Sequence, residues 1–268
     1  MRTLSASLWI LLAASGAAMG DAGPMTAESV EACMTANVPT TVRAQSVELV
    51  STDKGGSIRT LSGRIYASQE EDATRRRIRA VLQIDGPKDL AGAAYLVRET
   101  GVASRDGIYF YLPTVGSARK ITGASATNSL LGTDFSFQEF KLLLNAFQDV
   151  TVALEASSQL DGRPVYVATF KPREPDADKS LARAWIDQKS CVPLKVDFYR
   201  GDTVRKRAVV KPDAVKPAGD AWYPGEIDMR DLIAGTHSIL RATIVESATA
   251  VPSVVFDVTR FQRRYDEP

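Results

Sequence analysis

The chain has 268 residues, with 33 Lys and Arg against 32 Asp and Glu and a formal net charge of +1. This balance argues against a general nucleic-acid-binding protein, because such proteins carry a basic face or stripe. No nucleic-acid partner is therefore expected. The length is sufficient for one large domain with a substantial core.

The N-terminus has the pattern of a secretion signal. Arg2 gives a positive start, an apolar run extends from Leu4 to Ala18, and small residues lead to Gly20. A membrane anchor is the alternative, but the run is shorter than the roughly 20 residues that a spanning helix needs. We expect residues 1–20 to be a cleaved signal peptide and residues 21–268 to form a single domain in the periplasm.

A short helix is expected at the start of the mature chain, with Thr26 as its N-cap and Pro39 as its stop. This helix carries Cys33, and the other of the two cysteines, Cys191, stands at the start of an expected strand. In an exported protein the two cysteines favour a disulfide that ties the helix to the sheet. The alternative is two unpaired buried thiols.

The one basic concentration of the chain is Arg75–Arg79, which follows acidic residues at Glu70–Asp72. We interpret it as a solvated strand end paired with the acidic turn. The alternative is a contact for an anionic partner or a lipid headgroup.

A strand, a loop and a helix are predicted in succession between residues 107 and 147. The strand, Ile108–Leu112, has aliphatic residues and Phe110 on one face and two tyrosines on the other. A loop rich in Gly, Ser, Thr and Ala then covers residues 122–133. Ser136 and Glu139 have the spacing of a capping box that opens an apolar helix.

Strands dominate the rest of the chain. Alternating apolar residues predict strands at 78–84, 192–198, 240–244 and 254–258. Asp161-Gly162 predicts a hairpin between 150–160 and 163–170, and Gly201-Asp202 predicts a second. Residues 171–178 and 211–220 are expected to be surface loops. Many short antiparallel strands with few helices favour a sandwich, a barrel or a curved sheet wrapped over helices.

The chain carries few residues suited to catalysis. His237 is its only histidine, which excludes His-rich metal sites and leaves one candidate general base beside Ser238. Acidic residues such as Asp228 and Asp231 are most simply solvated carboxylates at a strand edge. The sequence contains no G-x-S-x-G, phosphate-loop or dinucleotide motif. We expect no metal, no cofactor and no enzymatic activity, with a hydrolase that uses His237 as the remaining alternative.

Several short motifs, taken in order, resemble the outer-membrane lipoprotein-sorting proteins, relatives of the LolA, LolB and RseB group of Gram-negative envelope proteins. They cover nearly the whole mature chain. The motifs are Tyr111-Leu112-Pro113, Arg119-Lys120-Ile121, Gly132-Thr133-Asp134-Phe135-Ser136, Ala184-Trp185-Ile186-Asp187, Val192 to Tyr199, Trp222-Tyr223-Pro224 with Ile227 and Met229, and Gly235-Thr236.

This resemblance implies a mainly β (α+β) fold, in which a strongly curved antiparallel sheet forms an incomplete barrel over a few helices. It also implies a carrier that holds lipid or lipoprotein acyl chains and delivers them between membranes, to an inner-membrane transporter or to an outer-membrane acceptor. The alternative is an RseB-like envelope-stress sensor that binds a membrane protein.

Eleven apolar residues are candidates for the lining of the implied groove, although a curved sheet needs such residues for its own core in any case. The candidates are Leu82, Ile84, Ile108, Phe110, Leu112, Phe135, Phe137, Phe140, Val196, Phe198 and Phe256.

Overall fold

A computed structural model describes residues 25–71, 76–102, 104–173, 180–244 and 252–264. The expected signal peptide, residues 1–20, lies outside these ranges. The helical elements are α1 (Ala27–Ala36), η1 (Gly123–Thr127), α2 (Phe137–Leu143), η2 (Pro212–Ala214) and η3 (Ser253–Phe256). The strands are β1 (Arg43–Thr52), β2 (Ile58–Glu71), β3 (Arg76–Gly86), β4 (Ala94–Arg98), β5 (Gly107–Tyr111), β6 (Ala118–Ile121), β7 (Val150–Leu154), β8 (Ser158–Leu160), β9 (Arg163–Pro172), β10 (Ser180–Asp187), β11 (Pro193–Arg200), β12 (Thr203–Val209), β13 (Val215–Ala218), β14 (Ala221–Pro224), β15 (Glu226–Asp231) and β16 (Thr236–Ile244).

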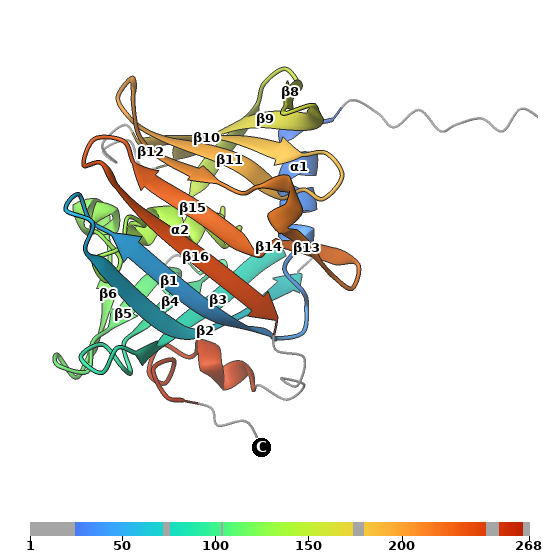
Figure 1. Ribbon diagram of the computed structural model, residues 1–268. Coiled ribbons are helices and arrows are strands. Elements are labelled where there is room, and N and C mark those ends of the chain that lie inside the picture. The colour runs from blue at the N-terminus through green and yellow to red at the C-terminus, as the bar shows by residue number, and fades with distance from the viewer. Residues whose placement is uncertain (1–24, 72–75, 103, 174–179, 245–251, 265–268) are drawn as a thin grey trace, which may run out of the picture.

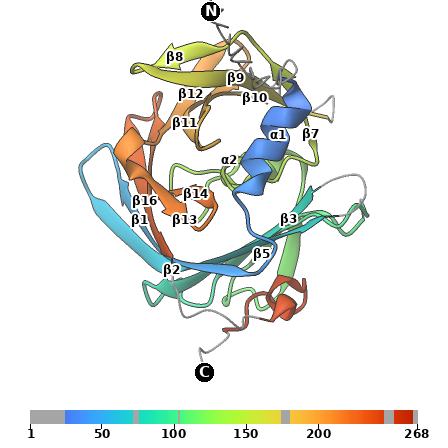
Figure 2. The same ribbon diagram turned by 90° about the vertical axis from the view of Figure 1, so that its right-hand side faces the viewer.

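One antiparallel sheet dominates the described part of the chain. Its strand order is β6-β5-β4-β3-β2-β1-β16-β15-β12-β11-β10-β9-β7, and β8 pairs with β9. The sheet does not close, because β6 and β7 remain at its two ends. It curves around α1 and α2 (Figures 1 and 2). This arrangement confirms the predicted fold class.

Helix α1 begins and ends near the predicted residues. The Thr26 side chain accepts a hydrogen bond from the Ser29 amide, and the helix ends at Ala36, before Pro39. Val30 and Met34 are buried against the inner side of the sheet. Cys33 forms a disulfide with Cys191, and the two Cα atoms are 5.7 Å apart. The predicted link between helix and sheet is therefore present.

The two predicted hairpin turns are also present. Asp161 and Gly162 have φ values of 48° and 78°, as a two-residue hairpin turn requires, and they join β8 to β9. Arg200 pairs with Thr203 across the turn at Gly201-Asp202. The predicted strand 150–160 is, however, divided into β7 and β8, which both pair with β9.

Three local predictions are wrong. Residues 254–258 form no strand, because β16 is already paired on both edges by β1 and β15, and the chain turns into η3 instead. Residues 211–220 are not wholly loop, since Val215–Ala218 pairs with β14. The second helix stops at Leu143, short of the predicted apolar repeat, and Asn145 then adopts a φ of 62°.

The sheet buries apolar residues on both of its faces. The main core lies on the inner face, between the sheet and the two helices. A smaller cluster on the outer face packs the C-terminal segment, through Val255, Phe256 and Phe261, against β2, β3 and β4. This outer packing anchors the end of the described chain.

Candidate functional site

The inner, concave side of the sheet is the candidate site. All the predicted groove residues except Phe256 join the apolar cluster on this side. Phe256 instead lies in the outer cluster and is 2% exposed. The period-2 alternation of the strands brings the strand residues together, and α2 and the loop before it supply Phe135, Phe137 and Phe140. Phe256 was assigned to a strand that does not form.

An aromatic cluster fills the space between β4, β5 and α2. The Phe110 and Phe137 rings meet edge to face at 5.0 Å, and the Phe135 and Phe140 rings do so at 6.0 Å. Tyr95 contacts Phe137 at 6.0 Å and Phe140 at 5.3 Å between ring centroids. Such contacts add to the burial of apolar area. The cluster joins the sheet directly to the helix.

Tyr95 is a site residue that the sequence analysis missed. It is fully buried, and its hydroxyl donates a 2.7 Å hydrogen bond to the Phe137 carbonyl oxygen. Burial raises the pKa of this phenol well above 10.0, so it remains a hydrogen-bond donor at neutral pH. The pairing of Leu82, Tyr95 and Phe110 across β3, β4 and β5 explains its position.

Part of this apolar interior is accessible from outside. Phe110, Leu112 and Ile121 are only partly buried, and they lie at the end of the sheet that β5 and β6 form. Leu131 and Leu142, from the loop before α2 and from α2 itself, are also partly buried against the same cluster. Apolar surface is therefore accessible at this end of the sheet.

A polar cluster holds the loop before α2 against the sheet. The Asp134 carboxylate accepts hydrogen bonds from the Thr236 hydroxyl and, at 2.6 Å, from the Ser238 hydroxyl of β16. Lys206 of β12 donates to the Asp134 carbonyl oxygen at 2.7 Å and to Glu139 at 2.9 Å. Glu139 also completes the predicted capping box with Ser136. Side chains from two strands thus hold the loop against the sheet.

A second polar group lies at the other end of α2. The Glu99 carboxylate accepts hydrogen bonds from the amides of Ile78 and Gln148, at 3.0 and 2.9 Å. Lys141, on α2, is 3% exposed and contacts Asp149 at 2.5 Å. Burial is the main cause of the raised pKa of Glu99, and the positive charge of Lys141 partly offsets it. Together with the capping box at its first turn, these contacts fix both ends of α2.

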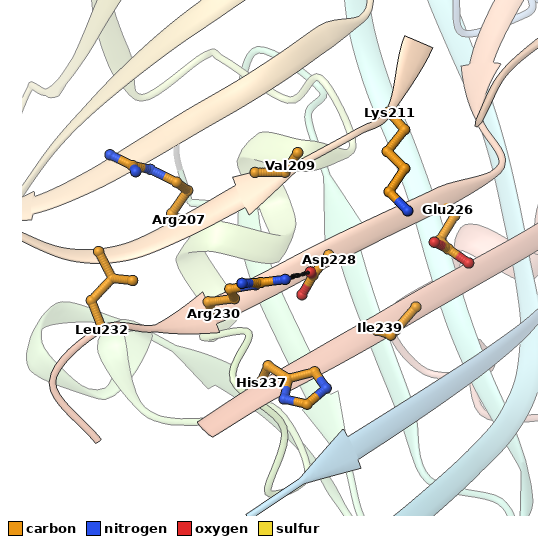
Figure 3. A pocket seen from close by; sticks show the side chains of 9 residues that line it. All are labelled: Arg207, Val209, Lys211, Glu226, Asp228, Arg230, Leu232, His237 and Ile239. Atoms are coloured by element: carbon orange, nitrogen blue, oxygen red, sulfur yellow. Dashed lines mark hydrogen bonds and ion pairs between the residues drawn. The ribbon is translucent and has the colours of Figure 1, made fainter. Parts of the chain in front are cut away.

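The candidate base His237 lies away from this interior. It lines a hollow of about 550 Å³ on the outer face of β12, β15 and β16 (Figure 3). The hydroxyl of the next residue, Ser238, points inward to Asp134, so the two side chains lie on opposite faces. Asp228 in the same hollow is paired with Arg230 at 2.8 Å. The described residues contain no cluster of metal ligands.

The described residues of the basic run form the start of β3, and Arg79 among them is largely buried. Arg76 and Arg77 pair in register with Glu71 and Glu70 of β2. Arg79 forms an ion pair with Glu70 at 2.7 Å. The acidic end of β2 and the basic start of β3 thus lie side by side.

Comparisons with known proteins agree with this fold. A family model described as "Uncharacterized protein" matches residues 77–263. No curated protein matches the chain. A DUF1329 family protein from Desulfovibrio piger ATCC 29098 is similar with a TM-score of 0.73 and 17% identity, over 86% of this chain and 95% of that one.

Two further solved structures share the architecture. A putative outer membrane lipoprotein-sorting protein domain from Vibrio parahaemolyticus has a TM-score of 0.72 and 17% identity, over 89% of this chain and 98% of that one. A LolA superfamily protein from Nitrosomonas europaea has a TM-score of 0.64 and 16% identity, over 87% and 98%.

None of the helices in the described ranges has the length and apolar character needed to cross a membrane. The match to the family model extends over more than half of the chain. The chain therefore belongs to the family that this model describes, and it has the LolA-like fold of outer-membrane lipoprotein-sorting proteins.

Proposed function

We propose that this protein is a periplasmic carrier that binds a lipid, or the acyl chains of a lipoprotein, on the concave side of its sheet. The observation that carries the proposal is the aromatic cluster beneath α2. There the apolar face of an open sheet is covered by two short helices and a loop, not by a second sheet.

The energetics of acyl-chain burial suit such a site. Each buried CH₂ group contributes ~0.8 kcal/mol, so an apolar groove holds a lipid tail without specific polar contacts. Phe110 and Leu112 offer a partly exposed apolar surface where a chain can first bind. The loop that carries Asp134 is held by a few hydrogen bonds, which opening of the site would exchange for water. Release then requires a competing site on a partner.

In this role the protein binds its ligand and does not catalyse a reaction. His237 faces the outer hollow, and Ser238 is engaged with Asp134 on the inner side. The proposed partners are a lipid or an acylated lipoprotein, with an inner-membrane transporter or an outer-membrane acceptor at either end of the transfer. A secretion signal in residues 1–20 would place the carrier between the two membranes.

Native mass spectrometry of the mature protein, purified from its periplasm without detergent, tests the proposal. The expected result is a stoichiometric adduct that organic extraction identifies as an acyl-containing lipid. A second preparation should be delipidated and mixed with a phospholipid, and we expect the adduct to return. A clean apo mass in both preparations would overturn the proposal.

A further inference from the structure

Two arginines face each other on the outer side of the sheet. Arg79 of β3 and Arg98 of β4 are direct partners in the strand register. Like charges in directly opposed positions of an antiparallel pair destabilise the pair. The next partners in the same row are Ser68 on β2 and Gly107 on β5, and neither carries a compensating charge.

The nearby carboxylates only partly offset these charges. Glu70 is 2.7 Å from one terminal nitrogen of Arg79 and is largely exposed. Asp257 accepts hydrogen bonds from the amide and hydroxyl of Thr259. Among the described residues, no carboxylate forms an ion pair with Arg98. The pKa of Asp257 is lowered mainly by its hydrogen bonds to Thr259 and least by the charge of Arg98, so Asp257 is only a distant counter-charge for Arg98.

Both arginines line a polar hollow of about 330 Å³. Glu70, Thr100 and Asp257 also line it, and Ser253, Val254 and Phe256 of η3 form its far wall. Figure 2 shows this C-terminal segment against the outer side of the sheet. The hollow is therefore bounded on one side by the sheet and on the other by a separate segment.

Packing holds the Arg79 guanidinium in place beside the hollow. The Nε of Arg79 is buried and has no hydrogen-bond partner among the described residues. The guanidinium lies over the Phe256 ring, 4.9 Å from its centroid, so packing fixes its position. Because Nε is not accessible from the hollow, an anion there would contact the terminal nitrogens of Arg79, which also contact Glu70 and Ser68.

We propose that this hollow binds a phosphate group between Arg79 and Arg98. Guanidinium groups match the geometry of phosphate oxygens and form strong, charge-assisted hydrogen bonds with them. The anion would offset the repulsion between the opposed cations and accept hydrogen bonds from their terminal nitrogens. The Ser253 hydroxyl stands at the wall to donate a further bond. Free phosphate and the phosphodiester of a lipid headgroup share this chemistry.

Calorimetric titration of the mature protein with inorganic phosphate at low ionic strength tests the site, with chloride at matched ionic strength as the reference. We expect phosphate to bind and chloride not to. Arg98→Gln should weaken phosphate binding by at least about tenfold, and Arg98→Lys should weaken it less. The matched control is Arg241→Gln, because Arg241 is an outer-face arginine already paired with Glu226 and Glu48.

Thermal unfolding gives a second readout. Without phosphate, Arg98→Gln should keep or raise the melting temperature because it removes the opposed charge, while phosphate should stabilise only the wild type. Dihexanoyl-phosphatidylglycerol, used as monomers, distinguishes the sources: binding that Arg98→Gln removes identifies a headgroup, and binding of inorganic phosphate alone identifies the free ion. Equal binding by wild type and Arg98→Gln, or no binding of either ligand to the wild type, would overturn the proposal. Neither result bears on the acyl-binding interior.

Discussion

Asp134 and Ser238 exchange two hydrogen bonds across 104 residues of sequence. The Ser238 hydroxyl donates to the Asp134 carboxylate at 2.6 Å, and the Asp134 amide donates to the Ser238 hydroxyl oxygen at 2.9 Å. Ser238 also contacts the Ser51 hydroxyl at 2.8 Å. The loop before α2 is thereby joined to β16 and β1, so movement of the loop must break this pair.

Asp134→Ala should release the loop. Hydrogen bonds to charged groups contribute about 1.5–3 kcal/mol each, so we expect a loss of about 3 kcal/mol in the free energy of unfolding. Hydrogen exchange should accelerate most at residues 129–137. Asp202→Ala, at an exposed hairpin turn, is the control and should change neither quantity. Unchanged exchange in Asp134→Ala would show that the pair does not hold the loop.

Phe110→Ser should weaken acyl-chain binding while the protein remains folded, because Phe110 is only partly buried in the inner cluster. The matched control is Tyr109→Ser, since Tyr109 is the next residue and faces the outer cluster. Displacement of a fluorescent fatty acid measures the affinity. Equal affinities of the two variants would remove Phe110 from the site.

Cys33→Ser should lower the melting temperature in oxidising buffer. The disulfide spans 158 residues, and for a loop of this size the chain-entropy account predicts about 5 kcal/mol. A reducing agent should destabilise the wild type and leave the variant unchanged. A wild-type melting temperature that is the same under both redox conditions would contradict this prediction.

Glu99→Gln should change the pH dependence of stability. Burial raises the folded-state pKa of Glu99 above its ordinary value of 4.5, so the folded state binds this proton more tightly than the unfolded state does. The stabilisation is present below pH 4.5 and is lost as the pH rises through the folded pKa.

Since Gln does not titrate, the unfolding free energy of Glu99→Gln minus that of the wild type should increase with pH across this window. Urea unfolding of both proteins at a series of pH values measures the difference. A difference that stays constant, or decreases with pH, would show that the folded pKa of Glu99 is not raised.

His237→Ala should leave acyl-chain binding and its affinity unchanged. His237 lies on the outer face, across the sheet from the aromatic cluster. Fatty-acid displacement and the melting temperature should both match the wild type. If the wild type showed a hydrolytic activity that a folded His237→Ala protein lacked, this result would instead favour the hydrolase alternative.

The sequence predicted most strongly those features that depend on local rules. Thr26 and the Ser136/Glu139 pair cap helices because capping needs only a few neighbouring residues. The Asp161-Gly162 turn follows from two residues that tolerate positive φ. Alternation along 108–112 assigned each side chain to its correct face.

The features that were missed depend on tertiary pairing. Residues 254–258 alternate like a strand, yet β16, the strand that precedes them, is already paired on both edges by β1 and β15, and Phe256 lies on the outer face. The register that places Arg79 opposite Arg98 appears in no single segment. The contact between Asp134 and Ser238 likewise joins two motifs whose separation in sequence hides it.

Photocrosslinking locates the ligand and therefore tests the central claim most directly. The delipidated mature protein would be loaded with a phospholipid that carries a diazirine in its acyl chain, irradiated and mapped by peptide mass spectrometry. The account predicts crosslinks to β5, α2 and the loop before α2, which Phe110→Ser reduces and Tyr109→Ser does not. Crosslinks confined to the outer face, around Phe256 or His237, would contradict it.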